Sequence, residues 1–431
     1  MSTAAVGVLR AEQIHRALLP TGLRILTVDR PGSGMVALHL LVSAGSRFDD
    51  GRPGLAQFVA DMLQRGTRRA SAQALAERLD AMGATLAVLP GLEAVTLAGR
   101  GLTEDFTDYL QLAAEVLTAP AFPPEEVAKV RGELLTELRV LEMDTRYAAE
   151  RAFRRLAFPP GHAHAQPPGG ETAVIESAES AGLAAFHQRR YRPSETILIL
   201  VGDVRPQSAL DHLEATLGGW APDGEGDGAE TSGAALGPAG GAPGRDLRRE
   251  TIAIPGKSQA DLVLGGVAVS RNDPDYYALM LATLILGRQG MMGRVGQRVR
   301  EELGLAYYSY VEARAGLLAG PWWARAGVNP ANVDRTVEAI LEEAVRFGRE
   351  GPTASELDDA RDFLVGSLAV RLETHAGQAA ALAEMEFFAL GLDYLERYPA
   401  IIRAVSADAI QAAARQFPTL DYALAVAGPP P

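Results

Sequence analysis

Cysteine is missing from this chain of 431 residues. Without cysteine the protein can form neither disulfide bonds nor thiolate metal sites, and its absence fits a cytoplasmic location. Long apolar runs are missing as well: no stretch of about 18 consecutive apolar residues occurs, so we expect no transmembrane helix. The first residues lack a basic segment followed by an apolar one, and we therefore expect no signal peptide.

Basic residues are scarce relative to acidic residues. Lys and Arg together number 41 against 54 Asp and Glu, which gives a net charge of −13. This excess of negative charge disfavours nucleic acid as a partner, because the phosphate backbone would be repelled. Apolar residues make up 47% of the chain, so the sequence can form well-packed cores. Its length predicts two or more domains.

The composition changes sharply near the middle of the chain. Residues 221–246 are rich in Gly, Ala and Pro and show no apolar periodicity, which is typical of a flexible linker. The flanking segments, 1–220 and 247–431, each begin with strand patterns and continue with helical patterns, so we interpret them as duplicated domains. This order favours an α+β fold, in which each domain packs a mainly antiparallel sheet against helices, over a doubly wound parallel sheet.

Each predicted domain carries a long helical pattern after its strands. In the first domain, Pro123 precedes a stretch that is predicted to be helical over 124–156. In the second domain, a helical run is predicted over 355–417, with breaks near Gly391 and Pro399.

A loop rich in Pro and Gly at 161–170 carries His162 and His164. Two histidines with this spacing could begin a metal site, but no third candidate ligand lies beside them in the sequence. We therefore interpret this segment as an ordinary loop.

One short helix in the first domain carries an unusual polar row. The stretch 54–67 has apolar residues at the spacing of a helix with one buried face, namely Leu55, Phe58, Val59, Met62 and Leu63. Gln57 and Asp61 stand one helical turn apart on the opposite side, with Ala60 beside them. Taken alone, this pattern indicates an ordinary amphipathic helix.

This stretch resembles the metal-binding helix of the pitrilysin/insulinase family of zinc peptidases, whose pattern is G-L-x-H-x-x-E-H-M-x-x-x-G-T. The scaffold residues match, but Gln57 and Asp61 stand where the family has its two zinc-binding histidines. Ala60 stands where the family has its general base. A carboxamide is a poor zinc ligand and alanine cannot accept a proton, so the resemblance implies a degenerate zinc motif.

The resemblance covers nearly the whole chain and extends to other positions of the first domain. The segment 186–194, followed by an apolar strand and Gly202-Asp203, is similar to the end of the family's first domain. The family's third zinc ligand, a Glu on a later helix, falls at Glu137, and an Asn on its substrate-pairing edge strand falls at Ala87. One Glu with Asp61 nearby would suit magnesium or calcium better than zinc, and we expect no tightly bound metal in this chain.

The second domain keeps what the first has lost. The segment 298–307 resembles the family signature R-E-x-x-G-L-A-Y and retains Arg300 and Tyr307. In active members these two residues reach the zinc site from the second domain, orient the substrate and stabilise the oxyanion. The glycine-rich loop 287–293 matches a family loop that can touch peptide substrates, which makes Gly290 and Gly293 candidates for substrate binding. The loop lacks the G-x-x-x-x-G-K-[ST] pattern of a nucleotide-binding loop.

Three hypotheses follow from this resemblance. In the first, the chain is a non-catalytic subunit that supplies Arg300 and Tyr307 to peptides held by a homologous, zinc-bearing partner chain. In the second, it is a peptide-binding or scaffold protein with no role in cleavage, and burial of Arg300 or Tyr307 in its own domain would favour this idea. In the third, it is an independent hydrolase with a metal at Asp61 and Glu137. We prefer the first, because only the chemistry of the first domain is lost.

Overall fold

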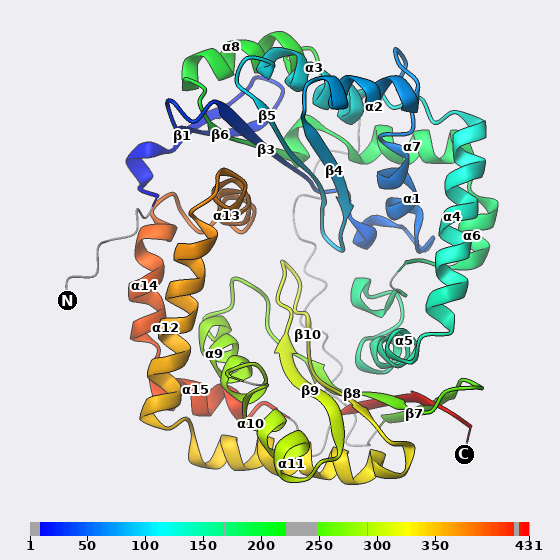
Figure 1. Ribbon diagram of the computed structural model, residues 1–431, viewed down its shortest axis with the longest axis vertical. Helices are drawn as coiled ribbons and strands as arrows, with labels where there is room; N and C mark the ends of the chain where they lie inside the picture. The colour runs from blue at the N-terminus through cyan, green and yellow to red at the C-terminus, as the bar shows by residue number, and fades with distance from the viewer. Residues whose placement is uncertain (1–8, 168, 221–247, 291, 418–421, 431) are drawn as a thin grey trace. The chain divides into compact units, whose positions relative to one another are not determined.

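The computed structural model describes residues 9–167, 169–220, 248–290, 292–417 and 422–430 (Figure 1). These residues form two compact units. The first unit contains residues 9–136, 169–220 and 367–398, and the second contains 137–167, 248–366 and 399–430, apart from the gaps just given. The predicted linker, 221–246, lies outside the described residues.

The first unit is built on a six-stranded sheet in the order β1-β2-β6-β3-β5-β4. The strands are β1 (His15–Leu18), β2 (Arg24–Asp29), β3 (Met35–Val42), β4 (Thr85–Pro90), β5 (Val95–Leu102) and β6 (Thr196–Gly202). Only β2 and β6 run parallel, and every other neighbouring pair is antiparallel. Strand β6 is buried along its whole length, which explains its uninterrupted apolar sequence.

Helices cover both faces of this sheet. Figure 1 shows α3 and α8 on one face and α13 on the other, where α13 packs against β3 and β6. The motif helix α1 packs against α7 and the edge strand β4. The helices of this unit are α1 (Leu55–Met62), α2 (Ala72–Ala81), α3 (Phe106–Thr118), α6 (Thr172–Ser177), α7 (Ser180–Arg190), α8 (Pro206–Leu217) and α13 (His375–Phe387).

The second unit is built on a five-stranded sheet in the order β7-β11-β8-β10-β9. The strands are β7 (Arg248–Ala253), β8 (Ala260–Val267), β9 (Ala306–Ala313), β10 (Pro321–Val328) and β11 (Ala423–Gly428). Here too only one pair, β7 and β11, is parallel. The order and directions repeat those of β2-β6-β3-β5-β4 in the first unit, as expected for a duplicated, mainly antiparallel α+β fold.

Two separate apolar cores lie on opposite faces of this second sheet. Leu262 and Leu264 of β8 belong to the core under the long helices, whereas Val263 between them belongs to the core under α5. This alternation is the two-residue period of a strand that is buried on both faces. The helices of this unit are α5 (Thr145–Ala157), α9 (Tyr276–Gly287), α10 (Gly293–Gly296), the π-helix η5 (Gln297–Glu302), α11 (Val333–Glu350) and α15 (Ala407–Ala414).

Each unit takes a helix from the other half of the sequence. Helix α5 precedes the predicted linker but packs on β7, β8 and β11 of the second unit, while α13 follows the linker and packs on the first. The division into units falls inside three helices: α4 (Pro124–Glu142), α12 (Ala354–Arg371) and α14 (Tyr394–Ala404). Each compact unit therefore combines segments from both halves of the sequence, whereas each predicted domain was one continuous stretch.

The helix predicted over 124–156 is in fact two helices. The break falls between Glu142 and Thr145, where the Asp144 side chain accepts a hydrogen bond from Tyr147 N at 2.9 Å and caps α5. In the run over 355–417, the break near Gly391 is confirmed, but Pro399 lies inside α14. Short 3₁₀ helices occur at Ala11–Gln13, Ser46–Phe48, Ala163–Ala165, Pro193–Glu195 and Pro330–Asn332.

No helix among the described residues combines the length and apolar character that crossing a membrane requires.

Burial keeps several histidines neutral. His187 of α7 is 6% exposed, and its Nε2 donates to the Leu117 carbonyl oxygen at 2.8 Å. Burial nevertheless lowers the pKa of His187 to about 4. Burial also lowers the pKa of His39 to about 4 and that of His164 to about 3. The opposite case is the fully buried Asp49, whose pKa burial raises to about 6.

We expect the free energy of unfolding to fall as the pH drops from 6.5 towards about 4. Unfolded histidines bind protons in this window while the buried native ones stay neutral. Asp49 acts in the opposite direction, because its native carboxyl takes up a proton below about 6, but one carboxyl does not offset three histidines. His187→Gln should reduce the slope of the free energy of unfolding against pH by up to about 1.4 kcal/mol per pH unit. The measurement is urea unfolding at several pH values. His15→Gln, at an exposed position, is the control. Equal slopes in the unaltered protein and both variants would contradict the assignment of this effect to His187.

We also expect Phe153→Ala to lower the free energy of unfolding by about 3–5 kcal/mol, because the cavity would lie under a rigid sheet. Phe153 is fully buried and packs edge-to-face on Trp323, with ring centroids 5.7 Å apart. Phe363→Ala is the matched control, since Phe363 is 59% exposed and should change stability by no more than about 0.5 kcal/mol. Similar losses in the two variants, measured by chemical denaturation, would show that α5 does not hold the sheet.

Candidate functional site

Helix α1 is anchored at its start by a buried carboxylate. Asp49 accepts hydrogen bonds from Gly54 N at 2.9 Å and Ala56 N at 2.7 Å, which satisfies backbone donors that a helix leaves unpaired. Gly54 has φ +103°, and a Cβ there would lie 2.9 Å from the Gly170 Cα, so only glycine fits. No pattern in the sequence gave a sign of this role for Asp49.

The polar row of α1 is only partly exposed. Gln57 and Asp61 are half-buried, and Ala60 between them is 1% exposed. The charge of Asp61 adds to burial, the larger cause, in raising the pKa of Tyr191, so Asp61 lies close to that phenol. At the position of the family's base, the helix therefore offers only a buried methyl group, which can neither ligate a metal nor accept a proton.

The remaining predicted ligand, Glu137, lies on α4 with an exposed side chain. One turn earlier, Glu133 pairs with Arg65 at 2.6 Å, which ties α4 to the segment just after α1. Among the described residues, no group of three or more His, Cys, Asp or Glu could hold a metal ion. His162 and His164 instead stack with Phe158, at ring-centroid distances of 4.9 and 5.0 Å.

Strand β4 forms one edge of the first sheet, next to α1. It pairs only with β5, so its other side carries no strand among the described residues. Gln64, just after α1, donates a hydrogen bond to the Leu86 carbonyl oxygen at 2.8 Å and fixes the helix to this strand. Ala87 is exposed and Leu89 is 57% exposed. An edge of this kind can accept an extended peptide as a further strand.

Arg300 lies on η5, a π-helix that continues α10. Its Nε is 3.5 Å from Glu301 Oε1, and its side chain is 34% exposed. On the same helix, Val299 is fully buried while Arg298 pairs with Glu302 at 3.0 Å. Packing of Val299 thus fixes the helix and leaves the Arg300 guanidinium within reach of solvent.

Tyr307 lies in a β-bulge near the start of β9. Val328 of β10 pairs with Ala306 and Gly327 pairs with Tyr308, so Tyr307 has no partner across the strand. The extra residue disrupts the ladder and turns its side chain outward, and Tyr307 is 79% exposed. The bulge therefore presents a phenol on β9, which is an edge strand of the second sheet.

A buried polar network supports this bulge and was not anticipated from the sequence. Asp261 of β8 is 3% exposed and accepts hydrogen bonds from the hydroxyls of Tyr308 and Thr145. Gln259 Nε2 also donates to it, at 3.2 Å. A single carboxylate in an otherwise apolar strand was the signal that could have revealed it. A Cβ at Gly327 would meet the Tyr308 ring at 2.4 Å, so glycine makes room for this ring.

The glycine-rich loop between α9 and α10 needs glycine for two reasons. Gly290 and Gly293 have φ of +61° and +65°, a region that favours glycine. A Cβ on Gly293 would also approach the backbone of Leu286 and Gly287 to 2.5 Å, so this residue is required by packing. Both glycines line a pocket of the second unit.

Two protein-family models match successive segments of this chain. Residues 24–160 match the model described as insulinase (peptidase family M16), and residues 179–364 match the peptidase M16 inactive domain. The second match covers Arg300 and Tyr307.

Several bacterial proteins are similar over nearly the full length. An uncharacterized zinc protease of Streptomyces coelicolor is 25% identical over 429 residues, covering 96% of this chain and 90% of that protein. The uncharacterized zinc protease YmxG of Bacillus subtilis is 24% identical, covering 96% and 98%. A Helicobacter pylori protein described as the non-peptidase homolog YmxG is 24% identical, covering 85% and 81%.

Solved structures give the same result. The peptidase M16 inactive domain from Pseudomonas fluorescens has a TM-score of 0.86 and 25% identity, covering 97% of this chain and 98% of that one. A protease from Helicobacter pylori has a TM-score of 0.85 at 16% identity, covering 96% and 99%, which shows the shared fold. With both halves matched by models of one family and the fold shared throughout, this chain belongs to the insulinase family of peptidases, M16.

Proposed function

We propose that this chain is the non-catalytic subunit of a heterodimeric zinc metallopeptidase. It would bind peptide and supply Arg300 and Tyr307 in trans to a homologous partner that carries an intact H-x-x-E-H motif. Zinc would belong to the partner, because the described residues of this chain contain no group of ligands that fits it. A cytoplasmic location is part of the proposal and stems from the absence of cysteine.

The asymmetry between the two domains carries this proposal. In α1 the zinc-binding positions hold Gln57 and Asp61, and the position of the base holds the buried Ala60. In the second unit, by contrast, Arg300 and Tyr307 are both present and both reach solvent. Both side chains could therefore contact a peptide that a partner chain holds.

The exposure of these two residues also separates the first hypothesis from the second. A scaffold protein would be favoured if Arg300 or Tyr307 were buried in its own domain. Tyr307 is 79% exposed and the Arg300 side chain is 34% exposed, so both are available to a ligand. The peptide-binding scaffold nevertheless stays the second candidate, because the exposed edge of β4 could bind an extended peptide without cleavage.

The chemistry required of the pair is transition-state stabilisation. Attack on a peptide carbonyl places negative charge on its oxygen, and a phenol or guanidinium donor can stabilise that charge. Loss of one such donor costs about 10²–10³ in kcat. A donor of this kind acts mainly on the transition state, so its removal should lower kcat more than it raises KM.

The test is reconstitution of the pair. We expect this chain, mixed with a homologous zinc-bearing subunit from the same organism, to produce chelator-sensitive peptide cleavage that neither chain gives alone. Tyr307→Phe should lower kcat about 10²-fold with little change in KM, measured by steady-state kinetics on a quenched fluorescent peptide.

Tyr310→Phe is the matched control, because Tyr310 is a half-buried tyrosine of the same strand and should leave kcat nearly unchanged. Cleavage by the partner that is indifferent to this chain, or to Tyr307→Phe, would contradict the proposal and favour the scaffold.

A further inference from the structure

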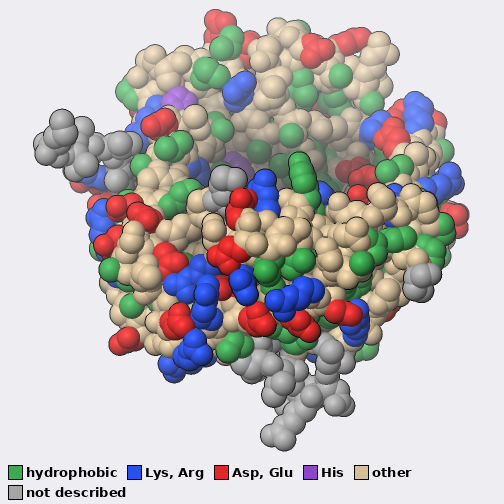
Figure 2. Space-filling view, turned by 60° about the horizontal axis from the view of Figure 1, so that its bottom comes forward, with side chains coloured by type: hydrophobic (Ala, Val, Ile, Leu, Met, Phe, Trp, Pro, Cys, Tyr) green, Lys and Arg blue, Asp and Glu red, His purple; other side chains and the backbone are tan. Residues whose placement is uncertain are grey.

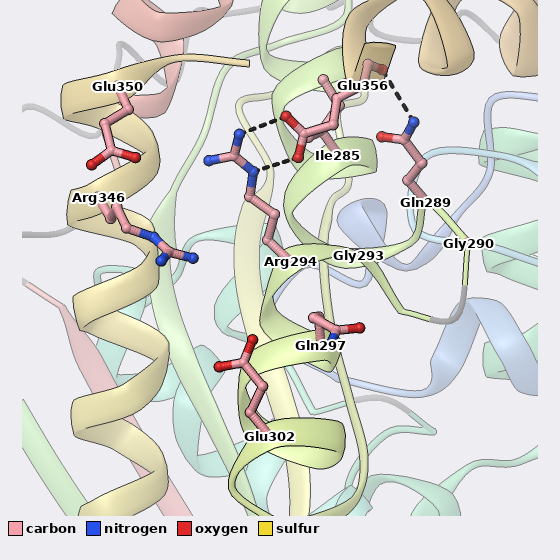
Figure 3. Close-up of a pocket in the computed structure, with 10 residues that line it drawn as sticks. All are labelled: Ile285, Gln289, Gly290, Gly293, Arg294, Gln297, Glu302, Arg346, Glu350 and Glu356. Atoms are coloured by element: carbon pink, nitrogen blue, oxygen red, sulfur yellow. Dashed lines mark hydrogen bonds and ion pairs between the residues drawn. The ribbon is translucent and has the colours of Figure 1, made fainter. Parts of the chain in front are cut away.

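A pocket of about 470 Å³ lies in the second unit, separate from the exposed face of Tyr307. Its walls come from the end of α9, the glycine-rich loop, the α10–η5 helix, the end of α11 and the start of α12 (Figure 3). This volume falls within the roughly 300–1,000 Å³ that is typical of small-ligand pockets. Among the described residues that line it, Ile285 is the sole aliphatic side chain, and most of the others are polar or charged.

Two arginines form the positive side of the pocket. Arg294 is fixed by a two-pronged ion pair with Glu356, at 2.6 and 2.5 Å. In Figure 3 its remaining nitrogen points away from Glu356, towards α11. The guanidinium of Arg346 points into the same space and is 51% exposed. Arg346 forms an ion pair with Glu343, which is 2% exposed.

Carboxylate and amide oxygens form the negative side. Glu302, at the end of η5, directs its carboxylate towards Arg346 in Figure 3 and is 46% exposed. Gln289 donates through Nε2 to the Glu356 carbonyl oxygen at 3.1 Å. Its Oε1 is buried and has no hydrogen-bond partner among the described residues. A buried acceptor without a partner is costly unless a donor arrives, and a ligand could supply that donor.

Around the pocket, positive and negative side chains lie next to one another. Arg346 pairs with Glu343, Arg349 with Glu350, and Arg298 with Glu302. On the face drawn in Figure 2, acidic and basic side chains are likewise interspersed rather than gathered by sign. A ligand with a single charge would meet repulsion from one side of the pocket, whereas a ligand with both charges would match both sides.

We propose that this pocket binds a small zwitterion with one carboxylate and one ammonium group, namely a free amino acid or a short peptide. The ligand carboxylate contacts Arg346 and the free edge of Arg294, since guanidinium groups recognise carboxylates well. The ammonium group contacts Glu302, and Gln289 Oε1 accepts a further N–H. The pocket shares Gly290 and Gly293 with the predicted substrate-binding loop, but neither Arg300 nor Tyr307 lines it, so the proposal does not depend on their trans role.

The test is a titration of the full-length chain by isothermal calorimetry with alanine, alanyl-alanine and alanyl-alanyl-alanine. N-acetylalanine and alaninamide serve as probes that carry only one of the two charges. We expect at least one zwitterion to bind at concentrations below about 10 mM and both single-charge probes to bind about 10-fold more weakly or not at all. Tightest binding by alanine identifies a free amino acid as the ligand class, and tightest binding by a longer probe identifies a peptide.

Two substitutions locate the binding site. Arg346→Gln and Glu302→Gln should each weaken binding about 10-fold or more, because each removes a charge-assisted contact. Arg335→Gln and Glu338→Gln, on α11 but outside the pocket, are matched controls and should leave affinity unchanged. If Arg346→Gln does not fold, because Glu343 loses its ion pair, Glu302→Gln carries the test.

The proposal is overturned if no zwitterion binds at about 10 mM, if a single-charge probe binds as well as its zwitterion, or if affinity is indifferent to Glu302→Gln. These outcomes leave the reconstituted peptidase untouched, since calorimetry needs neither zinc nor a partner chain.

Discussion

The structure depends on a reciprocal packing of helices on two sheets. Helix α13 covers β3 and β6 of the first sheet, although it comes from the C-terminal half of the chain. Its buried Glu386 pairs with Arg16 of β1 at 2.7 Å. Helix α5, from the N-terminal half, covers β8 and β11 of the second sheet through an apolar core that includes Trp323. Each sheet is therefore buried on both faces only when both halves of the sequence are present.

This constraint explains how catalytic residues could be lost without loss of the fold. Helix α1 is held by its apolar stripe, whose Phe58, Val59 and Met62 are fully buried, and by the Asp49 cap at its start. None of these contacts involves the two positions that bind zinc in active relatives. The apolar stripe and the Asp49 cap therefore hold α1 in place without the zinc-motif positions, whereas Tyr307 stands on a bulge that a buried network centred on Asp261 supports.

Much of this could be predicted from the sequence, because the signals were local or rested on a family pattern. The mainly antiparallel α+β fold, the amphipathic α1 and the degenerate motif at Gln57, Ala60 and Asp61 needed only periodicity and matched residues. The exchange of α5 could not be predicted, since two helices separated by a short break look like one long helix. The bulge at Tyr307 was also hidden, because strand register depends on the partner strand and leaves no mark in a single segment.

The central claim is that this chain cannot cleave peptides by itself, because α1 offers a carboxamide, a methyl group and a carboxylate where a zinc peptidase needs two imidazoles and a base. The most direct measurement is hydrolysis of a set of unfolded peptides by the purified chain alone, with added zinc and with a chelator. The account predicts no turnover above background in either condition. Turnover that rises with zinc and disappears with the chelator would contradict it.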